Sequence, residues 1–376
     1  MSTFTSRPTW ADIDLSALQH NLRQAESFCA AGQRILAVVK ADAYGHGAIP
    51  VTRALLGWGI ADFAVATLEE ALQLRDAGIV APLLVLGGCF PGQEEAFLNY
   101  ELMPALLDVA SAERLNAAGL RKGRKIRVHL KIDSGMGRVG FLPDRLGDFL
   151  PRLKSMGGLQ VEGFMSHLAC ADELNSPVTE EQRARFLTAL RMLREAGIEP
   201  RDIHLSNSAG LTGWSCPVCT LSRPGIMLYG GLPGAEFADR LDLRPVMNLR
   251  SRIAQLRDLP AGSGVSYGHC YHAEKDIRVA ILPIGYADGY NRLLSNRGQG
   301  ILRGRKVPVI GRVCMDWIML DVSSVPDAAV GDCVTLLGTA DDLLISGDSW
   351  AEQLQTISYE VFCRIGARVP RRYPEP

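Results

Sequence analysis

Eight short apolar runs recur through the first 230 residues of the chain, and segments with helical periodicity separate most of them. The runs are rich in β-branched residues and lie at 34–40, 61–66, 81–87, 103–107, 126–132, 159–166, 202–206 and 225–229. Helices are predicted at 12–29, 47–57, 68–77, 92–100, 143–156 and 178–196. This alternation favours a (β/α)8 barrel, and the alternative it leaves open is a doubly wound open sheet.

Two threonines mark expected helix starts. Thr67 and Thr179 are each followed by a pair of glutamates within the next three residues. A threonine hydroxyl caps free backbone N–H groups, and acidic side chains are favourable in a first helical turn.

The pattern changes after about residue 240. Short strand-like runs follow, punctuated by glycine and proline, and long helical segments are missing until near the end. These runs lie at 246–257, 277–283, 300–303, 307–313, 316–322 and 333–337. We therefore expect an α/β protein with an N-terminal (β/α)8 TIM-type barrel over 1–240 and a C-terminal mainly-β domain over 241–376.

Charge and hydropathy exclude several classes of partner. The chain has 40 Lys and Arg against 41 Asp and Glu, so it lacks the excess of positive charge that would favour nucleic acid or an anionic membrane surface as a partner. The longest nearly apolar run, 79–90, is too short to span a bilayer. The first residues lack the layout of a signal peptide, and we expect a cytoplasmic protein.

The nine cysteines are scattered, and most are expected to be buried and reduced. Cys216 and Cys219 form a single CxxC motif with no second pair nearby. A structural zinc site needs four ligands, so no metal is expected.

Lys40 ends the apolar run AVVK and is followed by the glycine-containing segment ADAYGHG. On a barrel this places it at the C-terminal mouth, where active sites lie. A lysine stem in an apolar barrel lowers the amine pKa, as a Schiff-base lysine needs. The alternative is a surface lysine just past a strand.

Other residues within or beside the later runs are expected at the same mouth. They are Lys131 inside the fifth run, Arg138 in the loop after it, His167 after the sixth, Asn207 and Ser208 after the seventh, and Arg223 and Gly225 at the eighth. Ser208 and the backbone near Gly225 fit a phosphate site of the kind built after the seventh and eighth barrel strands. Each residue alone also has a structural explanation, but together they predict a pyridoxal phosphate site or a sugar-phosphate aldolase site.

The segment AVVKADAYGHG resembles the pyridoxal-phosphate lysine motif of alanine racemases. The resemblance continues, in order, over nearly the whole chain. The matching segments are TWADIDLSAL, KIDSGMGRVG, SHLACADE, SNSAG, RPGIMLYG, VSYG, PIGYADGY, GRVCMDW and SYEVFCRIG.

The resemblance implies a racemase that interconverts L-alanine and D-alanine on pyridoxal 5′-phosphate. It implies that Lys40 carries the cofactor and is the base on one face of the substrate, while Tyr267 is the base on the other. Taken alone, Tyr267 would be a surface tyrosine. In the family the C-terminal domain caps the barrel of the other subunit, which implies a homodimer with shared active sites.

The remaining roles are also implied by the resemblance. The cofactor phosphate would meet Tyr44, Tyr359, Ser208 and the backbone of Gly225 and Ile226, with Asn207 beside them. Arg138 would lie near the cofactor's phenolic oxygen and the substrate, and a carbamylated Lys131 would orient it. Met315 and Asp316 of the partner would meet the substrate carboxylate, and Tyr286 would narrow the entrance.

Arg223 would face the pyridine nitrogen, supported by His167. A guanidinium can only donate hydrogen bonds, so it disfavours a protonated ring and a long-lived carbanion. Rapid reprotonation then favours racemisation over transamination.

Four alternatives remain. A broad-specificity serine and alanine racemase shares this chemistry, and a non-catalytic pyridoxal phosphate-binding barrel would not need Tyr267. A decarboxylase is expected to place a carboxylate opposite the ring nitrogen. An aldolase leaves residues 246–376 unexplained. The role implied by the resemblance is D-alanine supply for peptidoglycan.

Overall fold

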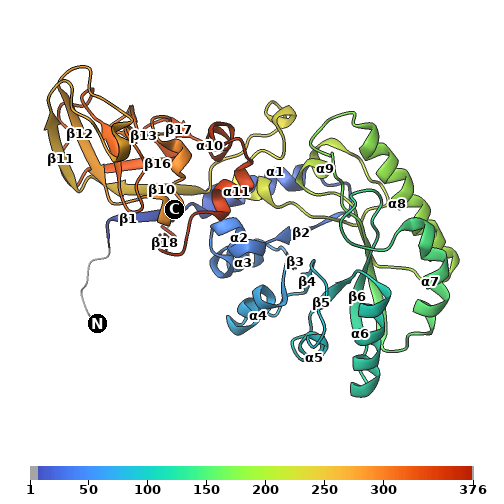
Figure 1. Ribbon diagram of the computed structural model, residues 1–376. Coiled ribbons are helices and arrows are strands. Elements are labelled where there is room, and N and C mark those ends of the chain that lie inside the picture. Colours follow the sequence, from blue (N-terminus) through green and yellow to red (C-terminus); the bar gives the residue numbers. More distant parts are fainter. Residues whose placement is uncertain (1–6, 375–376) are drawn as a thin grey trace.

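The computed structural model describes residues 7–374 and shows a parallel β-barrel beside a smaller sheet domain (Figure 1). The barrel strands are β2 (Arg34–Val38), β3 (Asp62–Val65), β4 (Leu83–Val85), β5 (Met103–Leu106), β6 (Ile126–Lys131), β7 (Leu159–Met165), β8 (Asp202–His204) and β9 (Leu221–Ser222). They pair in the order β8-β7-β6-β5-β4-β3-β2-β9. The Thr220 N–H donates to the Ile203 carbonyl at 2.8 Å, which ties the start of β9 to β8 and nearly closes the ring. The prediction of a (β/α)8 barrel is therefore confirmed, and the alternative of a doubly wound open sheet is wrong.

Helices cover the outside of this barrel. They are α1 (Leu15–Ser27), α3 (Ala48–Gly57), α4 (Leu68–Asp76), α5 (Glu94–Asn99), α6 (Val109–Lys122), α7 (Pro143–Ser155) and α8 (Pro177–Glu195). Thr67 caps α4 as predicted, and the Glu70 side chain completes a capping box. The predicted start at Thr179 is wrong, because α8 begins at Pro177 after Ser176. Proline suits a first helical position, because a backbone N–H there would have no acceptor within the helix and proline has none to leave unpaired.

Helix α6 was not predicted. Its buried residues are mostly small, namely Ser111, Ala112, Leu115, Ala118 and Gly119. The sequence carried signals for this helix, because the Asp108 side chain caps it by accepting from the Ser111 N–H at 2.7 Å and its apolar residues recur with helical spacing.

The eighth predicted strand is also wrong. Residues 226–229 form the 3₁₀ helix η1 (Ile226–Tyr229), and the eighth strand is the shorter β9. Pro224 has no N–H to donate to a neighbouring strand. The Gly225 N–H donates instead to the Ser208 side chain at 3.0 Å. Residues 226–229 are apolar and fully buried. A short buried apolar run fits a strand and a helix equally well, so the sequence pattern alone could not decide between them.

The second domain is mainly β, as predicted. One sheet has the order β14-β13-β16-β10-β1-β18, with β17 paired to β16, and a smaller sheet has the order β11-β12-β15. The strands of the larger sheet are β1 (Thr9–Ile13), β10 (Met247–Arg252), β13 (Gln299–Leu302), β14 (Arg305–Pro308), β16 (Cys333–Ala340), β17 (Leu343–Ile345) and β18 (Arg371–Arg372). Those of the smaller sheet are β11 (Gln255–Leu259), β12 (Ile277–Leu282) and β15 (Ile318–Asp321). The described part of the chain therefore passes through the larger sheet, as β1, before it enters the barrel.

Two short helices connect the larger sheet with the barrel mouth. They are α10 (Gly347–Leu354) and α11 (Ser358–Cys363), and α11 packs against α2 (Lys40–Gly45) at the end of β2 (Figure 1). This packing brings Tyr359 to the C-terminal end of the barrel strands. Among the described helices, none combines the length and apolar character that crossing a bilayer requires.

Candidate functional site

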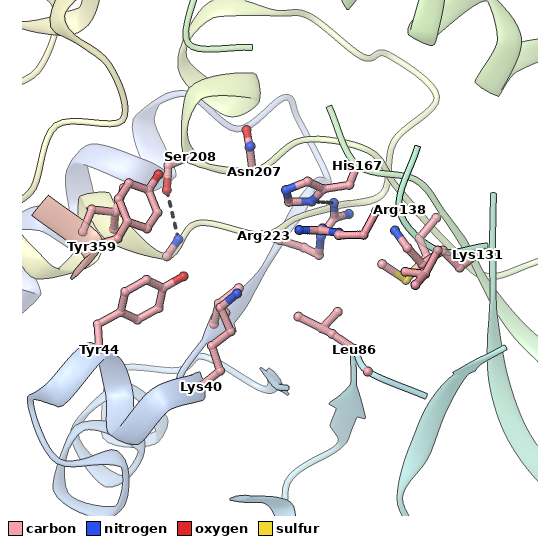
Figure 2. Close-up of a pocket in the computed structure, with 16 residues that line it drawn as sticks. Lys40, Tyr44, Leu86, Lys131, Arg138, His167, Asn207, Ser208, Arg223 and Tyr359 are labelled. Carbon is pink, nitrogen blue, oxygen red and sulfur yellow. Dashed lines mark hydrogen bonds between the residues drawn. The ribbon is translucent and has the colours of Figure 1, made fainter. Parts of the chain in front are cut away.

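A cavity of about 320 Å³ opens at the C-terminal end of the barrel strands (Figure 2). All the residues expected to hold the cofactor line it, together with Lys131. These residues are Lys40, Tyr44, Lys131, Arg138, His167, Asn207, Ser208, Arg223, Gly225, Ile226 and Tyr359. In Figure 2, Tyr44 and Tyr359 lie on one side of the cavity, Lys131 and Arg138 lie on the other, and Lys40 lies between them.

The rest of the lining was not predicted. It consists of Val38, Leu86, Gly87, Val139 and Met165. Apart from the glycine, these residues are apolar, and in a sequence they look like ordinary barrel core. Their position at or just after strand ends is the signal that could have identified them.

An unusual turn presents Lys40 and Tyr44 to this cavity. The four consecutive residues Ala41 to Tyr44 of α2 have φ between 51° and 54°, so they form a left-handed turn although none of them is glycine. Left-handed geometry costs non-glycine residues roughly 1–2 kcal/mol each, and such strain is often found at functional sites. The surroundings must therefore hold the turn in place.

Three side chains provide that support. The Ala41 N–H donates to Glu70 Oε1 at 2.6 Å, and the Ala48 N–H donates to Asp42 Oδ1 at 2.7 Å. His46 Nδ1 donates to the Tyr44 carbonyl at 2.9 Å. Burial lowers the pKa of His46 to about 4, so this histidine is neutral at physiological pH.

The Lys40 amine is set up to be a nucleophile. Burial lowers its pKa, and the positive charge of Arg138 lowers it further. The Glu70 carboxylate acts in the opposite direction but does not outweigh these effects. A lysine with a lowered pKa has more of the neutral amine that attacks a carbonyl group.

Hydrogen-bond donors without a partner gather on the Tyr44 side of the cavity. Neither the Tyr44 nor the Tyr359 hydroxyl has a hydrogen-bond partner among residues 7–374, and their rings lie 6.0 Å apart. Burial raises the pKa of both phenols, so both remain protonated donors. Tyr44 fits there only because residue 225 is glycine, since a Cβ on Gly225 would lie 2.3 Å from the Tyr44 hydroxyl.

Arg223 is fixed in the cavity wall by four contacts. Its Nη2 donates to the carbonyls of Ser166 at 2.7 Å and Leu205 at 3.0 Å. It also contacts His167 Nδ1 at 3.3 Å, while Nη1 contacts His204 Nδ1 at 2.9 Å. Burial lowers the arginine pKa to about 9, so the guanidinium is still charged at neutral pH. Nε has no acceptor among the described residues.

The proton positions on the neighbouring histidines follow from this arginine. A guanidinium only donates, so His204 Nδ1 is an acceptor and its Nε2 carries the proton. That Nε2–H donates to His129 Nδ1 at 2.8 Å, which leaves the His129 proton on Nε2. Burial lowers the pKa of both histidines, that of His129 to about 4, in agreement with two neutral rings. The same reasoning makes His167 Nδ1 an acceptor.

The glycine-rich loop after β6 is organised by one carboxylate. Asp133 accepts from the backbone N–H groups of Gly135, Met136, Gly137 and Arg138 at 2.8–3.1 Å. Partial burial opposes ionisation, but these donors outweigh it and lower the Asp133 pKa. The loop thereby holds Arg138 beside Lys131. Burial, followed by the charges of Arg223 and Arg138, lowers the pKa of the Lys131 amine to about 7.

Comparison with known proteins identifies the family of this chain. Residues 13–233 match the family model "Alanine racemase, N-terminal domain", and residues 246–373 match "Alanine racemase, C-terminal domain". The chain belongs to the alanine racemase family. It is 46% identical over 375 residues to the alanine racemase of Geobacter sulfurreducens, covering 99% of this chain and 98% of that protein.

Solved structures of the family have the same fold. Alanine racemase from Clostridium difficile 630 superimposes with a TM-score of 0.92 at 36% identity, covering 99% of this chain and 97% of that one. The Bacillus anthracis alanine racemase with bound L-Ala-P has a TM-score of 0.92 at 34% identity, covering 100% of this chain and 96% of that one. The resemblance seen in the sequence motifs is therefore confirmed.

Four residues expected at an alanine racemase site do not line the barrel cavity. Tyr267, Tyr286, Met315 and Asp316 lie in the C-terminal domain. Hydrogen bonds join their segments, because the Tyr286 N–H donates to the Cys314 carbonyl at 3.0 Å and Ser266 Oγ lies 3.3 Å from Cys314 Sγ. Asp316 also accepts from Arg368 at 2.7 Å. We call these four residues the Tyr267 cluster.

Most cysteines are free, as expected, but the expectation that most are buried is wrong, because among the free cysteines of residues 7–374 only Cys89 is buried. Cys216 and Cys219 form a disulfide, while the other cysteines are free. The turn between them brings their Cα atoms to 5.4 Å, within the range a disulfide requires. Among residues 7–374, no group of three or more His, Cys, Asp or Glu side chains could hold a metal ion.

Proposed function

We propose that this protein interconverts L-alanine and D-alanine with pyridoxal 5′-phosphate bound in the barrel cavity. The observation that carries the proposal is the shared cavity, where the Lys40 amine, the partnerless hydroxyls of Tyr44 and Tyr359, and the Arg223 guanidinium meet. Family membership supports the same activity.

The chemistry of the cavity fits that cofactor. A phosphate needs several hydrogen-bond donors, and Tyr44, Tyr359 and Ser208 supply hydroxyls beside the start of η1. An aldehyde needs a neutral amine, which Lys40 supplies. An unprotonated pyridine nitrogen needs a donor, and Arg223 is one that cannot accept. When bound, pyridoxal phosphate supplies an electron sink that acidifies the substrate α-proton.

The Arg223 site also argues against the decarboxylase alternative. Two carbonyls and two histidines surround the guanidinium, and no carboxylate contacts it among the described residues. An enzyme that stabilises a long-lived carbanion needs a carboxylate at this place, so the site favours quick return of the proton.

Racemisation in both directions requires a base on each face of the α-carbon. Lys40 can remove or return a proton on the face from which it enters the cavity. No second base from the same chain is expected on the opposite face, because the Tyr267 side chain is 70% exposed and lies outside the cavity. We therefore propose that Tyr267 of a second copy completes the site.

The exposed side chains around Tyr267 support such a dimer. Tyr286, Met315 and Trp317 are each between 42% and 52% exposed. A group of exposed aromatic and aliphatic side chains is typical of an interface. In this arrangement the barrel over residues 1–240 binds the cofactor together with Tyr359. The C-terminal domain of the second copy, residues 241–376, delivers Tyr267, and its Met315 and Asp316 meet the substrate carboxylate. Tyr286 would narrow the entrance.

Lys131 is proposed to carry a carbamate. Its pKa of about 7 leaves a substantial neutral fraction, and the neutral amine is the form that combines with carbon dioxide. The reaction joins nitrogen to carbon and releases one proton, which leaves a carboxylate on the lysine. That negative charge would lie close to Arg138 and would orient its guanidinium.

The activity is tested by proton NMR of L-alanine in heavy water with purified protein and pyridoxal phosphate, followed by chiral chromatography. We expect the α-proton signal to disappear while D-alanine accumulates. Exchange without D-alanine would contradict a base on each face, and no exchange would contradict the activity itself. Lys40→Ala is the matched inactive variant. Growth of a D-alanine auxotroph carrying this protein tests the proposed supply of D-alanine for peptidoglycan.

A further inference from the structure

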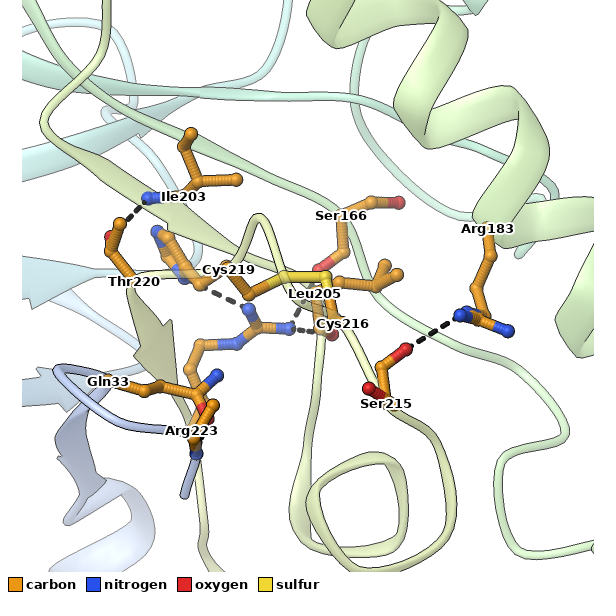
Figure 3. The surroundings of a disulfide bond; sticks show 12 residues. Gln33, Ser166, Arg183, Ile203, Leu205, Ser215, Cys216, Cys219, Thr220 and Arg223 are labelled. Atoms are coloured by element: carbon orange, nitrogen blue, oxygen red, sulfur yellow. Dashed lines mark hydrogen bonds between the residues drawn. A yellow bond between two sulfur atoms is a disulfide. The ribbon is translucent and has the colours of Figure 1, made fainter. Parts of the chain in front are cut away.

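The motif Cys216-Pro-Val-Cys219 has no role in the reaction proposed above. It lies in the loop between α9 (Ser208–Gly213) and β9. Each end of this loop leads to a cavity residue, since Ser208 begins α9 and Arg223 follows β9. The loop therefore connects two walls of the site. Figure 3 shows the disulfide together with Arg223.

The two sulfurs differ in their surroundings. Cys219 is 4% exposed and belongs to the main hydrophobic core, whereas Cys216 is half-buried at the core's edge. The Cys219 N–H donates to the Cys216 carbonyl at 2.9 Å, so the turn keeps the sulfurs close even without the covalent bond. An external thiolate can reach Cys216 more easily than Cys219, and the buried sulfur is then the one that leaves.

Hydrogen bonds on both sides hold the loop independently of the disulfide. Arg183 Nη2 donates to the Ser215 carbonyl at 2.6 Å, and Trp214 Nε1 donates to the Ala171 carbonyl at 3.1 Å. At the other end, Thr220 Oγ1 accepts from the Ile203 N–H at 2.8 Å. Opening the disulfide thus frees a short turn without releasing its ends.

Two of the free cysteines, Cys29 and Cys89, are poorer sites for such chemistry. Burial raises the pKa of Cys29 to about 11 and that of Cys89 to about 12, so both remain protonated thiols. Only Cys216 and Cys219 form a disulfide among the residues that the structure describes. Reversible disulfide formation is therefore expected only in this loop of the described chain.

We propose that Cys216 and Cys219 are a reversible thiol–disulfide modification site, and that its state sets the rigidity of the segment between Ser208 and Arg223. The co-reactant is a small thiol and its disulfide, such as glutathione. In reduction, the thiolate of one glutathione attacks Cys216 Sγ and forms a mixed disulfide with it. The bond between Cys216 Sγ and Cys219 Sγ breaks, and Cys219 leaves as a thiolate that takes up a proton. A second glutathione thiolate attacks the glutathione sulfur of the mixed disulfide, which releases oxidised glutathione and the Cys216 thiolate. Two electrons pass from the small thiols to the protein.

The first test measures the site directly. The full-length protein is equilibrated without oxygen in buffers of varied reduced-to-oxidised glutathione ratio, quenched with acid and treated with N-ethylmaleimide. Peptide mass spectrometry then reports the disulfide fraction for Cys216 and Cys219. We expect this fraction to follow the ratio and to reach the same value from oxidised and reduced starting protein, while Cys29 stays alkylated. A fraction that stays fixed, fully open or fully closed, would overturn the proposal.

The second test measures the rigidity of the loop by hydrogen–deuterium exchange over residues 214–225. A cross-link that closes a turn of four residues restricts the open ensemble, so reduction should speed exchange by up to about twentyfold. Equal exchange in the oxidised and reduced protein would overturn the link to the cavity. Neither test needs the cofactor or substrate, so its outcome is independent of the proposed racemase activity.

Variants separate the cross-link from the loss of a sulfur. Cys216→Ser removes the half-buried partner and leaves the core intact, and it should show the fast exchange at every glutathione ratio. Cys29→Ser is the matched control and should keep the glutathione dependence of the wild type. If Cys216→Ser exchanged as slowly as oxidised wild type, the disulfide would have no part in holding the loop.

Discussion

Nη1 of Arg223 lies 2.9 Å from Nδ1 of His204, inside the barrel and beneath the cavity. This contact sets the direction of a chain of donors, from Arg223 to His204 and from His204 to His129. The chain ends at His129 Nε2, which is buried and has no partner among the described residues. The charged arginine thus donates to a neutral ring, whose Nδ1 atom accepts the hydrogen bond.

Replacing Arg223 with glutamate should change the outcome of the reaction. A carboxylate at this place favours a protonated pyridine ring and a longer-lived carbanion, so pyruvate formed per racemisation event should rise on the order of tenfold. A coupled lactate dehydrogenase assay measures the pyruvate, and chiral chromatography measures the racemisation. Arg223→Lys keeps a donor and should retain the low ratio. An unchanged ratio in Arg223→Glu, with the cofactor bound, would sink this explanation of the arginine.

The buried histidines should make the protein less stable in mild acid. The pKa of His129 is about 4 in the folded state, below its ordinary value of 6.5, so the unfolded chain binds more protons between these values. Stability from this histidine is therefore complete above about pH 6.5 and is lost as the pH falls towards 4. The loss between pH 7 and pH 5 is about 2 kcal/mol.

Urea unfolding of His129→Gln at the two pH values tests this prediction. The glutamine can accept from His204 but does not titrate, so the drop in unfolding free energy from pH 7 to pH 5 should be smaller by about 2 kcal/mol. His272→Gln is the control, because His272 is exposed. An equal drop in wild type and His129→Gln would show that other groups cause the acid sensitivity.

Gly225→Ala should weaken cofactor binding. The added Cβ would lie 2.3 Å from the Tyr44 hydroxyl and must displace it from the phosphate side of the cavity. Loss of one hydrogen bond to a charged group predicts a rise in the pyridoxal phosphate Kd of about tenfold or more. Absorbance titration measures this Kd. Gly57→Ala is the matched control, since nothing lies within 4 Å of its added Cβ.

Much of the site could be predicted from the sequence because parallel strands bring their C-terminal ends to one mouth. Lys40, Arg138 and Arg223 are far apart in the chain, yet the barrel pattern places each at a strand exit. The left-handed turn after Lys40 was beyond prediction, because local propensity disfavours it and distant contacts such as that with Glu70 hold it.

Other misses have equally physical causes. The apolar run before Gly230 is buried in a 3₁₀ turn where a strand was expected, whereas α6 was missed although its capping residue Asp108 is visible in the sequence. The disulfide between Cys216 and Cys219 depends on a turn geometry that cysteine spacing alone does not specify. The role of Tyr267 came only from the family resemblance, since its chemistry depends on a second copy of the chain.

Carbamylation of Lys131 should be visible by carbon NMR. Protein equilibrated with ¹³C-bicarbonate at pH 8 should show a carbamate carbon signal, because the amine with a pKa of about 7 is then mostly neutral. The signal should fade as the pH falls below about 6 and be missing in Lys131→Ala. Lys125→Ala removes an exposed lysine and should keep the signal. A signal that persists in Lys131→Ala would place the carbamate elsewhere.

Mixing two inactive variants tests whether the site is shared between subunits. Lys40→Ala and Tyr267→Phe should each be nearly inactive alone, because each lacks one base at every site. After mixed refolding, half of the dimers contain one chain of each kind, and each of these has one site with both bases intact. Racemase activity should then return to about a quarter of that of the wild type. If Tyr267 served the cavity of its own chain, every site in the mixture would still lack one base and no activity would return.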